Sequence, residues 1–265
     1  MTIVGALSRH RFLATVAFLL VLAAVIAPVG AGDGIRTVAA GFSPPTAALP
    51  LGTDGLGRDV MARLLAGGRD LVVVAGVATA LAVIVGVALG LITSRPGGLT
   101  SALRWILDVV LVVPAMLTML VLIFGIGPGV LTVVIITAAI SAPFVARFVR
   151  SLARPLLSSE FVLIARSGGD SSATIFGREV LPVLAGPIAA DAGARFVGAV
   201  YLVASASFLG FDPLGSSSDW ASMVQSGLAG IALNPWAALA PALAIALITV
   251  PANLLVDRVL REVTQ

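Results

Sequence analysis

Two ionisable residues lie in the middle of an apolar stretch and are the first candidates for chemistry. Asp191 and Arg195 stand four residues apart with the acid first, the spacing at which two side chains meet on one helix face. Ionisable groups within apolar sequence are costly and generally face a cavity or a partner. We expect either a self-compensating pair against a neighbouring helix or two charges that line a wet translocation path. A second local pair is expected between Arg104 and Asp108.

A glycine-rich segment, residues 52–59, has the spacing of a phosphate-binding loop but the wrong chemistry. It carries Arg58 where such loops carry lysine, and Asp59 where a hydroxyl would bind Mg²⁺. A tight turn that leads into a short interfacial helix, capped by Thr53 or Asp54, suits these residues better. The segment is therefore expected to be a structural lid or a direct contact for a substrate.

The composition argues against most catalytic and metal chemistry. The chain contains no cysteine, and its single histidine, His10, lies near the start between two arginines. We expect no catalytic residue, no metal site and no cofactor bound by this chain itself. The net charge of +3 is too small to favour a nucleic-acid partner, and arginines gathered at the ends of apolar runs favour a membrane surface instead.

The elements that must position these residues are long apolar runs. Hydrophobic residues make up 59% of the chain and charged residues 11%. A helix rises about 1.5 Å per residue, so about 20 apolar residues cross a bilayer. Gly86 and Gly90 would let two such helices approach closely. We predict an all-α membrane protein with six transmembrane helices, at residues 12–29, 71–92, 106–124, 130–146, 183–209 and 237–256.

The arginines orient the predicted helices. With the N-terminus in the cytoplasm, eleven arginines fall on the inner side and four on the outer side, which favours two cytoplasmic termini. The first run could instead be a signal peptide, since residues 29–31 resemble a small-residue cleavage site. Either way, the orientation of the later helices is the same.

The longest polar stretch, residues 147–182, has the pattern of a helix pair. Residues 160–166 are predicted to form one helix, which Gly168, Gly169 and Asp170 break. Residues 171–179 are predicted to form a second helix, capped by Asp170 or Ser171, before the next apolar run. Its mixture of apolar and charged residues suits an interfacial loop or a docking knob for a cytoplasmic partner.

Four short segments follow one another in this stretch: Glu-Phe-Val at 160–162, Ala-Arg at 165–166, Gly at 169 and Leu-Pro at 181–182. Their order and spacing resemble the cytoplasmic EAA loop of ABC-importer permeases. Leu163 and Ile164 replace the Glu and first Ala that name the loop. Other segments, at 51–59, 207–210 and 253–257, resemble the C-type subunit of dipeptide/oligopeptide (Dpp/Opp-type) permeases in order and spacing. Val203 stands where that family usually carries a glutamate.

The resemblance implies a type I ABC importer permease architecture, a transport subunit in the bacterial cytoplasmic membrane and not an enzyme. The chain would form half of a pathway for dipeptides or oligopeptides. The implied partners are a homologous B-type permease, cytoplasmic ATP-binding subunits that hold ATP and Mg, an extracytoplasmic substrate-binding protein and membrane lipid. The residues implied to couple to the ATP-binding subunit are Glu160, Phe161, Ala165, Arg166, Gly169, Leu181 and Pro182.

The expected organisation has three parts. Residues 1–70 hold the first helix and an outer loop, residues 71–257 the permease core with coupling loop 147–182, and residues 258–265 a cytoplasmic tail. The outer segment 210–235 is expected to be a solvated loop with a re-entrant helix, near the place where a binding protein docks. The candidate extracytoplasmic contacts are Asp54, Arg58, Asp59, Asp212, Asp219 and Trp220.

Two alternatives stay open. A self-sufficient secondary transporter or channel would show an internal repeat of broken helices with midplane charges in both halves, and the sequence shows one such pair. Within the ABC family, the cargo could instead be nickel, glutathione or another small ligand.

Overall fold

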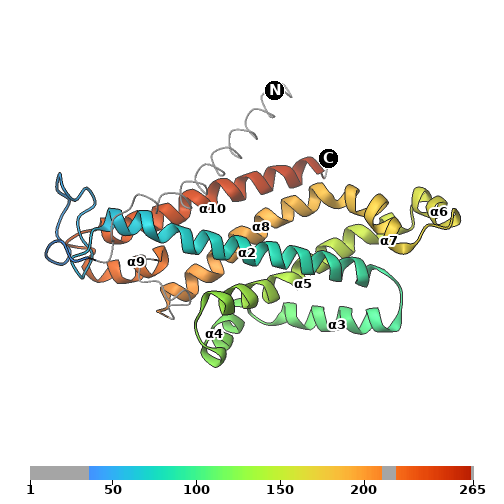
Figure 1. The fold of residues 1–265 in the computed structure, drawn as a ribbon, viewed down its shortest axis with the longest axis horizontal. Coiled ribbons are helices and arrows are strands. Elements are labelled where there is room, and N and C mark those ends of the chain that lie inside the picture. The colour runs from blue at the N-terminus through green and yellow to red at the C-terminus, as the bar shows by residue number, and fades with distance from the viewer. Residues whose placement is uncertain (1–35, 211–218, 264–265) are drawn as a thin grey trace, which may run out of the picture.

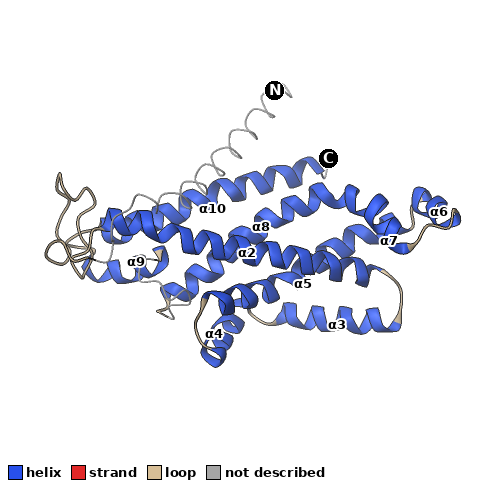
Figure 2. Cartoon of the chain, viewed as in Figure 1, coloured by secondary structure: helices blue, strands red, loops and turns tan. Residues whose placement is uncertain are grey.

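The computed structural model describes residues 36–210 and 219–263 (Figures 1 and 2). The first predicted helix at 12–29, the possible cleavage site at 29–31 and Asp212 lie outside the described residues. The described chain forms a long bundle of helices. These are α2 (Val60–Ser94), α3 (Gly98–Val112), α4 (Ala115–Ile126), α5 (Val130–Leu157), α6 (Glu160–Ser167), α7 (Ser172–Ile175), η2 (Phe176–Val180), α8 (Leu181–Phe208), α9 (Trp220–Gly227), η3 (Leu228–Gly230) and α10 (Trp236–Val263).

Three helical segments of the described chain are long and apolar enough to cross a membrane. They are α2, α5 and the continuous helical run Ser172–Phe208, which joins α7, η2 and α8. The pair α3 and α4 supplies a fourth if it counts as one broken span, and Trp236–Ala252 of α10 is a shorter apolar helix. The described residues thus support three or four of the six predicted spans.

The span predicted at 106–124 is not one continuous helix. α3 ends at Val112, α4 begins at Ala115, and the two helices are bent by 91° relative to each other. Pro114 lies at the break, where it lacks an N–H for the helix and restricts Val113 to an extended conformation. Pro114 therefore accounts for the end of α3 and the new start at α4.

The separate interfacial helix predicted after the glycine-rich segment is also wrong, because that segment leads directly into α2. This helix runs unbroken for 35 residues, about 50 Å, through the domain division expected at residue 70. Asp59 caps it by accepting the N–H of Met61 at 2.9 Å, so the predicted caps Thr53 and Asp54 are wrong as well.

The close approach predicted for Gly86 and Gly90 is confirmed, and α5 is the partner of α2. A Cβ added at Gly86 would lie 2.5 Å from the Cβ of Val145, and one added at Gly90 would lie 2.7 Å from the Cβ of Val149. The two backbones are therefore closer together than a side chain at position 86 or 90 of α2 would permit. This seam runs through the core, which α8 and α10 complete.

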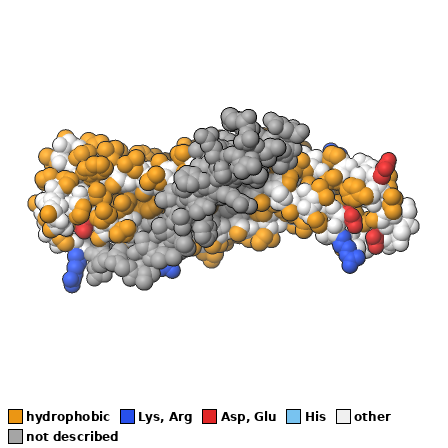
Figure 3. Space-filling model, turned by 90° about the horizontal axis from the view of Figure 1, so that it is seen from above, with side chains coloured by type: hydrophobic (Ala, Val, Ile, Leu, Met, Phe, Trp, Pro, Cys, Tyr) orange, Lys and Arg blue, Asp and Glu red, His pale blue; other side chains and the backbone are white. Residues whose placement is uncertain are grey.

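The polar parts of the molecule lie at its two ends. Figure 1 shows α6 and α7 at one end of the bundle, and α9 with the 36–59 loop at the other. On the face shown in Figure 3, charged side chains gather toward these ends, and hydrophobic side chains cover much of the described surface between them. An apolar middle between polar ends matches a bilayer with water on both sides.

Candidate functional site

The helix pair between α5 and α8 turns at a glycine. The N–H of Gly169 donates to the carbonyl of Arg166, and the N–H of Asp170 donates to the carbonyl of Ala165, both at 3.1 Å. This crossed arrangement ends α6 with a residue of positive φ, and Gly169 has φ +89°. The turn predicted at Gly169 is confirmed.

The second helix begins as predicted but does not end where expected. The hydroxyl of Ser171 accepts the N–H of Thr174 at 3.2 Å, so Ser171, and not Asp170, is the cap. The chain then passes through the π turn η2 and continues as α8, with Leu181 and Pro182 in its first turn. The helix pair is therefore continuous with a long apolar helix.

The helix pair buries one face and exposes another. Val162, Ile175 and Val180 are buried in a cluster that includes Val145 and Val149 of α5. On α6, by contrast, Phe161 is 40%, Leu163 49% and Ile164 72% exposed. The pair is thus anchored to the bundle while an apolar surface stays uncovered at the end of the molecule. The predicted coupling residues Glu160, Arg166, Gly169, Leu181 and Pro182 are exposed, and Ala165 is half-buried.

Asp191 and Arg195 form the ion pair that their spacing predicts. The Nη2 atom of Arg195 lies 3.0 Å from Oδ1 of Asp191, and the Asp191 side chain is 9% exposed. The Arg195 guanidinium also lies over the ring of Phe144 on α5, 5.2 Å from its centroid. This geometry matches the first of the two expectations, an ion pair on α8 that neutralises its own charges and packs against α5.

The local pair predicted between Arg104 and Asp108 is wrong. Asp108 on α3 instead pairs with Arg150 on α5, with a distance of 3.3 Å between the Nη2 and Oδ1 atoms. The contact ties α3 to α5. Spacing along one helix favoured Arg104, and only the packing of α3 on α5 brings Arg150 near.

Acidic residues at the other end hold the fold together. Asp54 accepts the N–H groups of Leu56 at 2.8 Å and Arg58 at 2.9 Å, and pairs with Arg63. The 52–59 segment is therefore a turn organised around its own carboxylate. No phosphate could be cradled there without displacing that group.

The remaining outer candidates also have intramolecular contacts. The Asp219 side chain accepts the N–H of Ser222 and caps α9. The indole N–H of Trp220 donates to the carbonyl of Leu64 at 2.7 Å, and its ring lies against Gly68 of α2. The Trp220 contacts join α9 to α2. A direct role in binding a partner would require Asp219 or Trp220 to leave these intramolecular contacts.

Asn234 is a residue that sequence reasoning missed. Its side-chain amide donates to the carbonyls of Leu51 and Thr53, both at 2.9 Å, and the residue is fully buried. It therefore joins the 36–59 loop to the turn before α10. The signal in the sequence was the Asn-Pro dipeptide at 234–235, which favours a turn.

An apolar bundle with a buried ion pair and a helix pair projecting from one end defines a polytopic α-helical membrane protein. The chain belongs to the family described as "Binding-protein-dependent transport system inner membrane component", which it matches over residues 82–265. It is thus a transport subunit of the inner membrane.

Curated relatives are similar over most of the chain. The peptide transport system permease protein SapC of Escherichia coli O6:H1 is 32% identical over 214 residues, which cover 80% of this chain and 72% of SapC. The di/tripeptide transport system permease protein DppC of Pseudomonas aeruginosa is 27% identical over 260 residues, which cover 96% of this chain and 85% of DppC. The resemblance to ABC-importer permeases of the dipeptide/oligopeptide class is therefore confirmed.

A solved structure supports the same fold. A chain of the MetNI methionine ABC transporter in an inward-facing conformation superposes with a TM-score of 0.57 at 19% identity. The match covers 75% of this chain and 97% of that chain. The fold of this chain is that of an ABC importer permease.

Proposed function

We propose that this chain forms half of the translocation pathway of an ATP-driven importer for dipeptides or oligopeptides. The substrate class rests on the SapC and DppC relatives, whose names specify peptide and di/tripeptide transport. The partners are a homologous B-type permease, cytoplasmic ATP-binding subunits that bind ATP and Mg, and an extracytoplasmic substrate-binding protein. Both termini lie in the cytoplasm, and the chain has six spans, one of them within residues 12–29.

The helix pair α6–α7 is the docking element for the ATP-binding subunit. The observation that carries this assignment is the exposed apolar surface of Phe161, Leu163 and Ile164 on a pair that is anchored by buried valines. Exposed apolar groups in a polar region mark contacts with another protein. The continuous run Ser172–Phe208 would carry a movement of the docked pair into the membrane.

The exposed face of α8 is the proposed wall of the pathway. A mainly apolar groove of about 520 Å³ lies between α8, α9 and α10, and Tyr201 on α8 is 73% exposed beside it. This face would meet the B-type permease or the passing peptide, whose termini could reach the Asp191–Arg195 pair. The outer end, with Arg58 half-buried at its surface, is the proposed contact for the substrate-binding protein.

Replacing Gly169 tests the coupling role. A β-branched side chain resists positive φ, so Gly169→Val should distort the turn and abolish peptide uptake while the chain still inserts into the membrane. Gly169→Asn is the matched control, because asparagine tolerates positive φ and no atom lies within 4 Å of the added Cβ. Uptake of a labelled dipeptide by the two variants is the measurement.

The outcomes separate coupling from folding. Normal uptake by Gly169→Val would remove the coupling role, and loss of uptake in both variants would show that the side chain itself, not the turn, is the problem. Purification of the tagged chain should also retain an ATP-binding subunit. A chain that transports peptide without that subunit would support the secondary-transporter alternative.

A further inference from the structure

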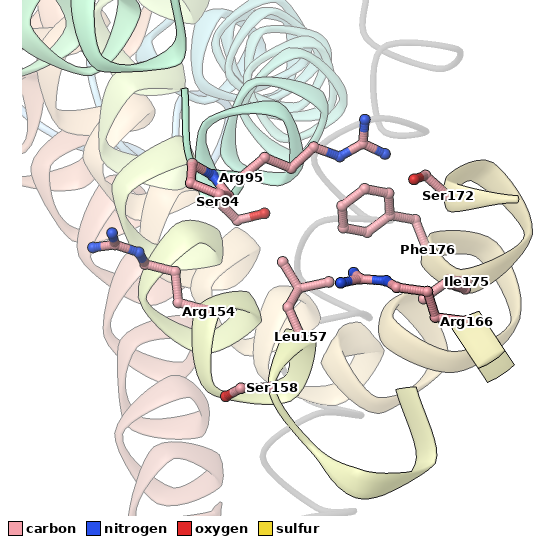
Figure 4. Close-up of a pocket in the computed structure, with 10 residues that line it drawn as sticks. Ser94, Arg95, Arg154, Leu157, Ser158, Arg166, Ser172, Ile175 and Phe176 are labelled. Carbon is pink, nitrogen blue, oxygen red and sulfur yellow. The ribbon is translucent and has the colours of Figure 1, made fainter. Parts of the chain in front are cut away.

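A cavity lies where the helix pair meets the ends of α2 and α5. It has a volume of about 450 Å³ and is open to the surface. Figure 4 shows Arg95, Arg154 and Arg166 around it, with Phe176 and Leu157 between them.

The charge of this cavity is unbalanced. Three arginine residues line it and no lining residue is acidic. Among residues 36–210 and 219–252, whose side chains the structure describes, the ion pairs involve Arg63, Arg150 and Arg195, and none of them involves a cavity arginine. Arg95 instead lies over the Phe176 ring, 4.7 Å from its centroid. Like charges gathered without a counterion favour the binding of an anion.

The arginines come from separate elements that meet only in the folded chain. Arg95 follows the last residue of α2, Arg154 lies in the last turn of α5, and Arg166 lies in α6. In Figure 4, the Arg166 side chain extends toward Leu157, whereas the Arg154 head group turns to the far side. Both are exposed and long enough to reorient toward a ligand.

The position of the cavity favours a phosphate attached to a lipid. Apolar helix α2 ends at Ser94, so Arg95 stands at the border between its apolar run and the polar end of the molecule. The cavity wall also carries Leu157, Ile175 and Phe176, which a free phosphate would not use. Basic pockets between membrane helices on the cytoplasmic side suit anionic headgroups.

We propose that this cavity binds the phosphate group of an anionic phospholipid of the inner leaflet. A phosphate there would receive hydrogen bonds from α2, α5 and α6 together and hold the helix pair against the bundle. The assignment of the leaflet rests on the proposed function, which places the helix pair in the cytoplasm. The binding itself depends only on the cavity.

Lipid binding can be measured on the full-length chain purified with the subunits that accompany it. Short-chain dioctanoyl phosphatidylglycerol should bind saturably, as followed by native mass spectrometry and by a rise in melting temperature. Dioctanoyl phosphatidylcholine should bind more weakly. Removing one guanidinium, in Arg95→Gln or Arg154→Gln, should weaken phosphatidylglycerol binding about fivefold, and removing both should weaken it further. Arg178→Gln is the matched control, because Arg178 is exposed on the adjoining η2 segment outside the cavity.

Each outcome decides the proposal. Equal binding to the double variant and the unchanged chain, at matched helix content, would overturn it. Inorganic phosphate or glycerol 3-phosphate that binds as tightly as the lipid would assign the cavity to a soluble anion instead. Loss of the ATP-binding subunit from Arg154→Glu, without any lipid binding to the unchanged chain, would assign the cavity to an acidic partner side chain. None of these readouts uses transport, so they stand apart from failure of the proposed function.

Discussion

Asp54, Asp59 and Asp219 lie at the end of the molecule opposite the helix pair, and their side chains all accept backbone N–H groups. Each acceptor satisfies a donor that a turn or a helix start would leave without an intrahelical partner. Next to a bilayer such unsatisfied groups are costly, because lipid offers no hydrogen bonds. These three carboxylates therefore mainly stabilise the turns and helix starts in which they lie.

Val203 is a single-residue difference with a clear structural setting. The resemblance described above implies a glutamate at this position, whereas the structure places Val203 fully buried in the central core. A carboxylate there would need a partner inside the bilayer. The apolar residue thus matches its surroundings.

A prediction at this scale concerns the Asp191–Arg195 pair. Asp191→Ala should destabilise the chain by about 1–3 kcal/mol, because it leaves the Arg195 guanidinium beside Phe144 without its carboxylate. Arg195→Ala should likewise destabilise, and the double variant should lose less than the sum of the two. Thermal unfolding in detergent micelles is the measurement. Strict additivity of the two single effects would show that the pair contributes no coupling energy.

At the scale of elements, the α2–α5 seam is the strongest organising contact. Gly86 and Gly90 lie one helical turn apart, so both face α5 and bring the two backbones together. Membrane helices lack a hydrophobic driving force between them, and close van der Waals packing takes its place. The short distances from these glycines to Val145 and Val149 therefore account for the association.

Filling this seam should separate the helices. Gly90→Leu should cost about 1–3 kcal/mol of stability or prevent assembly, because the side chain would enter space held by Val149. Gly76→Leu on the same helix is the matched control, since no atom lies within 4 Å of a Cβ added there. Yield and melting temperature of the two purified variants are compared. Equal loss in both would mean that helix propensity or insertion, not the seam, limits stability.

At the scale of the whole molecule, the long apolar helices separate two polar ends that have different structures. One end is a loop and short helices tied down by Trp220, Asn234 and Asp54. The other is a helix pair with an uncovered apolar surface and an adjoining basic cavity. One tied-down end and one end with an uncovered apolar surface are what the proposed docking of an ATP-binding subunit at the helix pair would require.

The absence of cysteine makes this arrangement testable by single introduced thiols. Ile164→Cys and Leu56→Cys place exposed thiols at opposite ends, since these side chains are 72% and 62% exposed. A membrane-impermeant maleimide should label Leu56→Cys in intact spheroplasts and Ile164→Cys only in inside-out vesicles. Added ATP-binding subunit should slow the reaction at residue 164. The cysteine-free chain is the control, and labelling of both thiols from the same side would contradict the topology.

The sequence by itself determined the local features of this protein. Apolar run length predicted membrane-crossing helices, the Gly169 turn followed from residue type, and the Asp191–Arg195 pair followed from i,i+4 spacing. Residue type also limited the cap of the second helix to Asp170 or Ser171, and the structure selected Ser171. All of these depend on residues within about one helical turn of each other or on composition along one run. The resemblance of residues 160–182 to a known loop likewise needed only order and spacing.

The tertiary structure alone decided every contact between residues distant in the chain. It gave Asp108 the partner Arg150 in place of Arg104, and it brought the Trp220 indole to the carbonyl of Leu64. It also gathered Arg95, Arg154 and Arg166 around one cavity. The physical reason is that helix propensity and apolar periodicity fix which face of a helix is buried, but not against which helix or at what height. Those depend on how small residues such as Gly86 and Gly90 let particular backbones approach.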